Sequence, residues 1–326
     1  KLIETNAQWW ILDEFCTTLD RTTAKVVAYN VQKQARRLNK AVITATTHTD
    51  LLPDLHPTIH IHKKTGNQVT ITRHRNTSPK QCSLLKTIKI QEGTRADYNQ
   101  LATFHYRSHH PGAVRKIYTA TCSPHEVCGV IVYTYPPLVA AGRNKVLPRI
   151  PIAELNRKLS NISRVITHPK YRTTVLAQKL VSQTLRLAGT PHVETTAVMA
   201  RHNPFFQKAG MTQTHQTNPP KQAQAIQAVL NQLDFNTTLL SNKKCVTFQL
   251  KHLTDTELAQ VKHSFAENMH PRFRNTETTN PTKKELTKLI QITATLLQTK
   301  TYLTWQNKTQ PKDQPTQNSS QPQPNP

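Results

Sequence analysis

The sequence predicts an α/β fold that extends over more than one domain. Apolar runs at 9–15 and 41–45 are typical of strands and flank a helical pattern, and strand-like and helical stretches alternate over 86–211. Further amphipathic stretches at 221–233 and 283–304 predict packing helices. A chain of 326 residues is long enough for two ordinary domains. We therefore divide it into residues 1–78, 84–215, a mainly helical extension at 216–306, and 307–326.

Composition limits the environment and the partners. Lys and Arg total 43 against 18 Asp and Glu, for a formal charge of +25, which favours RNA or another polyanion as a partner. The alternative explanation of this charge is a general bias in the amino-acid composition of the source organism's proteins. The five cysteines form no CxxC pair and no secretory signal is present, so we expect reduced thiols in the cytoplasm. No apolar run approaches the roughly 20 residues of a membrane span. The Gln/Pro/Asn/Ser-rich tail from Asn307 predicts disorder.

The first segment places acidic residues at the end of an apolar strand. In residues 9–15 the apolar run is followed by Asp13 and Glu14. This order fits a buried parallel strand that places carboxylates at its carboxyl end. A helical pattern follows Asp20, and the apolar run 41–45 leads to His48. An apolar strand ending in Asp-Glu is common, and a capping carboxylate pair is the simpler explanation of that feature alone.

This order of elements resembles the C-terminal part of an ABC-type ATPase domain, over about residues 1–75: Walker B, D-loop, helix and H-loop. The resemblance implies that Asp13 holds Mg²⁺ through its water shell and that Glu14 positions the attacking water. It also implies that Asp20 lies at a homodimer seam and that His48 contacts the γ-phosphate of ATP.

The phosphate-cradling part of such a domain is not in the sequence. A P-loop requires G-x-x-x-x-G-K-[ST], and none of the seven glycines is followed by lysine. We therefore expect ATP and Mg²⁺ binding only in a longer protein, of which this chain is an N-terminally truncated fragment. The start at Lys1 rather than Met points the same way, and a relic ATPase segment is the alternative.

The middle segment begins with a strand and a capped helix. Residues 87–93 alternate like a half-buried strand, and Thr94 with Asp97 has the spacing of a capping box. Strand-like runs follow at 116–121, 127–134 and 162–167. A turn then leads into a helix whose predicted apolar face is listed here: Leu176, Leu180, Val181, Thr184 and Leu187.

This element order, with the segments 165–177 and 203–211, resembles the GNAT class of acyl-CoA N-acyltransferases. The first segment is similar to the family's coenzyme A motif, in which free N–H groups at a helix N-terminus meet a diphosphate. The resemblance implies acetyl-CoA as cofactor. The implied binding residues are Val165, Ile166 and Thr167 on the strand, and Arg172, Thr173, Thr174, Val175, Leu176 and Ala177 on the turn and helix.

Several residues depart from the family pattern. Thr173 and Val175 stand where glycine is usual, and their side chains crowd the expected phosphate position. Phe206 stands where a tyrosine often protonates the departing thiolate. His168, Tyr171 and His202 are the nearest titratable residues, although a strand end, a packed aromatic and a surface loop are the simpler explanations of them.

The two likenesses together, with Phe104–Arg107 and His110–Lys116 between them, resemble an archaeal-type group of predicted ATPase–acetyltransferase fusions. The resemblance implies an acetyl-CoA-dependent N-acetyltransferase of unknown acceptor. The alternative is a nucleic-acid-associated ATPase in which the GNAT fold is a non-catalytic binding module. Residues 244–250 look like one more strand that returns to the acetyltransferase sheet.

Overall fold

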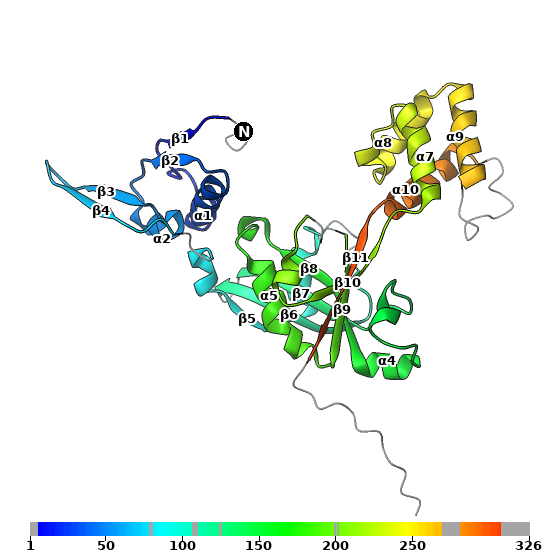
Figure 1. The fold of residues 1–326 in the computed structure, drawn as a ribbon, viewed down its shortest axis with the longest axis horizontal. Helices are drawn as coiled ribbons and strands as arrows, with labels where there is room; N and C mark the ends of the chain where they lie inside the picture. Colours follow the sequence, from blue (N-terminus) through cyan, green and yellow to red (C-terminus); the bar gives the residue numbers. More distant parts are fainter. Residues whose placement is uncertain are drawn as a thin grey trace, which may run out of the picture.

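The computed structural model describes residues 6–77, 81–105, 110–123, 126–198, 200, 202–268 and 281–307. Within them the fold is mixed α/β, and a central sheet lies between a small N-terminal segment and a group of helices (Figure 1). Its strand order is β10-β11-β9-β8-β7-β6-β5. The strands are β5 Lys89–Glu92, β6 Val114–Ser123, β7 Glu126–Thr134, β8 Leu159–Thr167, β9 His192–Ala197, β10 Thr212–Thr217 and β11 Lys300–Gln306.

Helices cover both faces of this sheet because the strands alternate their side chains. On β7, Val130 and Val132 face α3, while Ile131 and Tyr133 face α5. The predicted capping box forms, since Thr94 and Asp97 exchange hydrogen bonds at the start of α3. The elements around the sheet are α3 Arg95–Ala102, η4 Arg143–Lys145, α4 Ile152–Lys158, η5 Pro169–Tyr171, α5 Leu176–Thr184, η6 Leu185–Ala188 and α6 Phe205–Lys208.

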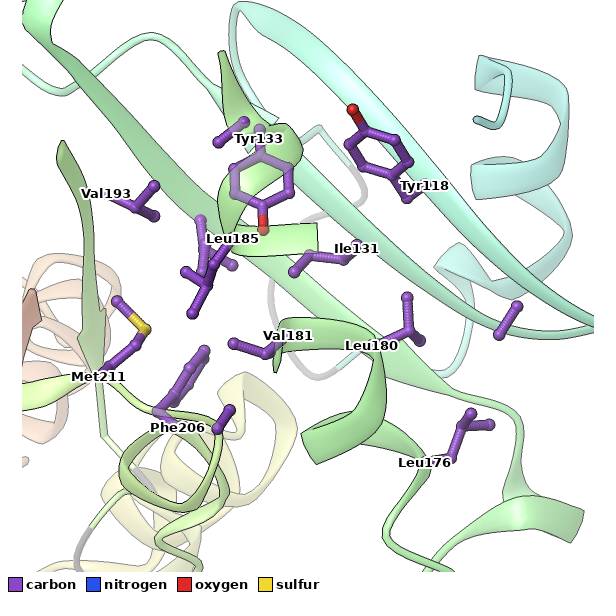
Figure 2. Packing of buried hydrophobic residues seen from close by; sticks show 14 of the residues in the cluster. Tyr118, Ile131, Tyr133, Leu176, Leu180, Val181, Leu185, Val193, Phe206 and Met211 are labelled. Carbon is purple, nitrogen blue, oxygen red and sulfur yellow. The ribbon is translucent and has the colours of Figure 1, made fainter. Parts of the chain in front are cut away.

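The larger core of the sheet lies under α5. Leu176, Leu180 and Val181 of the helix belong to one buried cluster with Ile131, and Phe206 joins this cluster from α6 (Figure 2). The predicted apolar face of the helix is therefore confirmed, except at its last position. Leu187 lies in η6 and is 48% exposed, because the α-helix ends at Thr184 and the tighter 3₁₀ turn rotates that side chain outward.

The helices after residue 220 pack on one another and interrupt the order of the strands. They form a core of their own and stand apart from the sheet (Figure 1). Strand β11 then returns between β9 and β10, so the sheet extends beyond the expected boundary at 215. The predicted helix over 283–304 thus ends early, at Leu296. The elements are α7 Lys221–Gln232, η8 Thr237–Leu239, α8 Lys243–His252, α9 Asp255–Asn268 and α10 Lys283–Leu296.

The strand predicted at 244–250 is wrong, because these residues belong to α8. Asn242 accepts hydrogen bonds from the N–H groups of Lys244 and Cys245 and so starts a helix. Val246 and Leu250, one helical turn apart, are buried, whereas Phe248 is 63% exposed. The alternating pattern on which the strand prediction rested therefore does not match the burial.

The N-terminal segment is a parallel strand pair covered on one face by a helix. Its elements are β1 Trp9–Leu12, α1 Arg21–Arg37, β2 Ala41–Thr44, η2 Thr49–Leu51, α2 Leu52–Leu55, and the hairpin β3 Ile59–Lys63 and β4 Val69–Arg73. The parallel pairing of β1 with β2 is as predicted. The expected burial of β1 is only half correct, since Trp10 is 3% exposed but Trp9 and Ile11 are 62% and 74% exposed. Helix α1 covers one face of the pair, and no described residue covers the other.

Contacts join the N-terminal segment to the sheet. Asp54 is buried and accepts hydrogen bonds from the backbone and hydroxyl of Ser83, which begins η3 Ser83–Lys86. Asp20 lies 3.8 Å from Lys170, and the Lys33 ammonium lies 3.5 Å from the carbonyl of Thr173. Helix α1 therefore lies beside the turn that precedes α5.

Candidate functional site

Strands β8 and β9 separate partway along the sheet. They pair in parallel only from Leu159 to Asn161, opposite His192 to Glu194. Beyond this point β8 continues to Thr167 beside β7, while β9 remains paired with β11. The last link is a hydrogen bond of 3.0 Å from the Thr195 hydroxyl to the carbonyl of Ile162. The β9-facing backbone edge of 163–167 therefore pairs with no other described strand.

A turn with an unusual backbone connects the free end of β8 to α5. Thr173 has φ +68° and Val175 has φ +76°, both in the left-handed region. β-Branched residues rarely adopt this region because the Cβ atom approaches the backbone, at a cost of about 1–2 kcal/mol per residue. Both residues nevertheless adopt the conformation that glycine supplies easily. Such strain clusters at functional sites, where the surrounding structure imposes it.

The first turn of α5 presents unpaired donors. Val175 is the N-cap, and no side chain caps the helix there. The backbone N–H groups of Val175, Leu176, Ala177 and Gln178 donate to no acceptor among the residues that the structure describes. These groups carry the positive end of the helix dipole and bind anions readily. An anion at this position would satisfy donors that the protein itself leaves free.

The packing of α5 fixes this turn in place. Gly129 on β7 lets the helix approach, since an added Cβ atom there would lie 2.8 Å from Cδ1 of Leu180. Thr174 is fully buried and donates its hydroxyl proton to the carbonyl of Tyr171 at 2.6 Å. Leu176 is buried, so this predicted site residue offers only its backbone N–H outward. Arg172 is exposed at the mouth of the turn, and Ala177 lies on the first helical turn.

A polar cluster that the sequence did not reveal lies under the turn. The Tyr171 hydroxyl donates to a carboxylate oxygen of Glu126 at 2.8 Å and lies 2.8 Å from the Cys122 sulfur. Burial, followed by these two neighbours, raises the pKa of Tyr171, so this phenol stays protonated. The cluster anchors the turn to the β6–β7 hairpin. Cys122 and Glu126 lie on the two strands of that hairpin, whereas Tyr171 is 45 residues further along the chain than Glu126, so only the fold brings it to them.

The other proposed acid–base positions have defined surroundings. His168 accepts a hydrogen bond from the Lys170 N–H through Nδ1, and burial, then Lys170, lowers its pKa. Phe206 is 6% exposed within the core and has no proton to donate. His202 is exposed on a loop. On β8, Ile166 is buried, while Val165 and Thr167 are half-buried on the strand that leads to the turn.

The ATPase-like residues lie at the carboxyl end of the β1–β2 pair. Asp13 and Glu14 follow β1 and are exposed, and His48 follows β2 and is half-buried. Asp20 is the N-cap of α1 and accepts hydrogen bonds from the backbone and hydroxyl of Thr23, which lower its pKa. Among the described residues no three His, Cys, Asp or Glu side chains converge on a metal position.

No protein-family model matches the sequence, and a search of curated proteins finds no significant match. Among solved structures, Arabidopsis thaliana NAA60 in complex with acetyl-CoA shares 13% identity over 41% of this chain and 89% of its own, with a TM-score of 0.32. A Bacillus subtilis acetyltransferase in complex with CoA shares 14% sequence identity over 40% of this chain and 80% of its own, with a TM-score of 0.28. Spermidine/spermine N-acetyltransferase SpeG from Vibrio cholerae shares 8% sequence identity over 42% of this chain and 85% of its own, with a TM-score of 0.31. These structural neighbours are GNAT acetyltransferases and cover about 40% of the chain.

Proposed function

We propose that the chain binds acetyl-CoA, or a related coenzyme A thioester, at the junction of β8 and α5 and transfers the acyl group to an amine. The observation that carries the proposal is the group of free N–H donors from Val175 to Gln178, directly beyond the strained turn. A diphosphate fits these donors because it brings several acceptor oxygens and negative charge to one helix end. The predicted residues 165–167 and 172–177 supply the strand and turn of this site.

The separation of β8 from β9 supports the same assignment. Pantetheine carries two amides, and such a chain pairs with an unpaired strand edge as a further strand would. Residues 163–167 offer such an edge immediately before the turn. With the diphosphate at α5, the thioester lies near the point of divergence at Ile162 and Thr195.

Acyl transfer then proceeds by direct attack of the amine nitrogen on the thioester carbonyl. The nitrogen–carbon bond forms, the carbon–sulfur bond breaks, and the amine proton is lost while the coenzyme A thiolate is protonated. Phe206 offers no hydroxyl for the last step. We propose water as the proton donor, because the buried Tyr171 is already engaged with Glu126 and Cys122.

Phe206 favours the second candidate, in which the fold is a non-catalytic binding module. A fold that holds coenzyme A without a positioned proton donor retains the carrier and loses turnover. Isothermal titration of the full chain with coenzyme A and acetyl-CoA tests the shared binding step. A mass-spectrometric assay for acetylated amines, with spermidine, lysine peptides and RNA as acceptors, then separates the enzyme from the module. If neither carrier binds, both candidates are wrong.

The partner and ATPase predictions remain proposals. The charge of +25 supports RNA or another polyanion as acceptor or partner, and residues 1–78 are proposed to form a homodimer surface. ATP binding through Asp13, Glu14, Asp20 and His48 requires a phosphate-binding loop that these 326 residues do not include. None of the described helices is long and apolar enough to cross a bilayer.

A further inference from the structure

Positive side chains from separate parts of the chain gather around the turn before α5. Lys33 comes from α1, and its ammonium lies 3.5 Å from the carbonyl of Thr173. Lys208 comes from α6, and its backbone carbonyl accepts a hydrogen bond of 3.1 Å from the side-chain amide of Gln178, in the first turn of α5. The charge of Lys208 is near enough to Lys33 to lower the pKa of that lysine. Arg37, one helical turn beyond Lys33, extends the group. The N-terminal segment thus brings its own charge to the turn.

No carboxylate of a described residue forms an ion pair with this group. Among the described residues, Lys33, Arg37 and Lys208 have no acidic side chain within ion-pair distance. Partial burial, followed by the nearby charges of Lys208 and Arg37, lowers the pKa of Lys33. Like charges without a counterion repel one another, and a bound anion relieves that repulsion. By contrast, Lys25 and Arg21 on the same helix both lie beside Asp50.

The contact at Thr173 also bears on the shape of the turn. Thr173 is exposed and strained, and its carbonyl accepts a hydrogen bond from Lys33. The Lys33 ammonium also lies 5.6 Å from the centroid of the Tyr29 ring. Lys33 therefore both brings positive charge to the turn and donates a hydrogen bond to its strained residue Thr173. If Lys33 only supports the turn, its hydrogen bond to the Thr173 carbonyl is what matters. If Lys33 binds an anion, its positive charge beside the turn is what matters.

We propose that Lys33 of the N-terminal segment, together with Lys208, binds the diphosphate of the carrier, so that residues 6–77 form part of the coenzyme A site. This inference rests on the proposed function. It assigns a role to a part of the chain outside the sheet, and it makes the affinity for the carrier depend on the packing of α1 against the turn.

The test is isothermal titration of the full chain with coenzyme A, comparing wild type with Lys33→Met, Lys33→Arg and Lys25→Met. Lys25→Met removes the same charge from the same helix, about 12 Å away along its axis. We expect Lys33→Met to weaken binding about tenfold, because a hydrogen bond to a charged group is lost. Lys33→Arg should restore most of the affinity, and Lys25→Met should change it less than twofold.

Dephospho-coenzyme A keeps the diphosphate and lacks the 3′-phosphate, so it identifies the group that Lys33 meets. The tenfold loss should persist with this ligand, and its disappearance would overturn the assignment to the diphosphate. If wild type binds coenzyme A and Lys33→Met binds equally well, this inference is wrong while the proposed function stands. If wild type binds neither ligand, the proposed function itself fails. Equal thermal unfolding of Lys33→Met and wild type shows that a loss of affinity is not a loss of fold.

Discussion

Replacing Thr173 by glycine should stabilise the protein. Thr173 is exposed at φ +68°, so its side chain contributes little packing and its Cβ atom carries the cost of the left-handed region, about 1–2 kcal/mol. Glycine removes that cost but adds conformational freedom to the unfolded chain, which offsets about 0.4–1 kcal/mol. We expect the free energy of unfolding to rise by about 0.5–1 kcal/mol.

Urea denaturation followed by circular dichroism measures this change, and a thermal scan should show a Tm higher by about 2 °C. Thr173→Ala is the matched control, because it removes the hydroxyl and methyl groups but keeps the Cβ atom and hence the strain. Its unfolding free energy should stay within about 0.5 kcal/mol of wild type. A glycine variant less stable than the alanine variant would refute the argument that this turn is strained. Coenzyme A affinity should be unchanged or higher in the glycine variant, since less side chain then borders the phosphate position.

Three further predictions concern the support of the site. Gly129→Ala should lower the unfolding free energy by about 1–3 kcal/mol and weaken coenzyme A binding, because the new methyl group displaces α5 at Leu180; unchanged values for both would contradict this view of the packing. Glu194→Gln should cost about 3 kcal/mol in urea titrations, since it leaves the buried Arg143 guanidinium without its carboxylate, and a loss below 1 kcal/mol would show that the pair is not effectively buried. The lowered pKa of His168 means that folding disfavours its protonation, so its contribution to stability is present above about pH 6.5 and is lost as the pH falls through the lower folded value. Urea midpoints between pH 5 and 8 should show this loss in wild type and a flatter profile in His168→Asn.

The sequence predicted the local parts of the candidate site. The helix at 176–184 and its turn follow from apolar spacing and a short motif, both of which depend on residues near one another in the chain. The capping box at Thr94 was recognisable for the same reason. The left-handed conformation of Thr173 and Val175 was not visible in residue types that avoid it, and only the motif alignment with glycine positions hinted at it.

The remaining differences have long-range causes. The pairing of β11 joins Tyr302 to Thr196, and no local pattern specifies a partner more than a hundred residues away. Residues 244–250 alternate in polarity yet form a helix, because the Asn242 cap and the partners of Val246 decide the outcome. Likewise, the position of Lys33 beside Thr173 depends on how two segments pack, which no local pattern specifies.

The late position of β11 in the chain determines when the sheet can close. Strand β9 is complete by Ala197, but its neighbour on one side is synthesised only at 300–306, after the four helices from α7 to α10. A nascent chain therefore exposes the edge of β9 while those helices emerge, and exposed strand edges invite intermolecular pairing. Closing so long a loop slows folding. The helices form a core of their own, and their folding shortens the flexible chain between β9 and β11. The order of synthesis thus delays closure of the sheet beside β9 until residues 300–306 have been made.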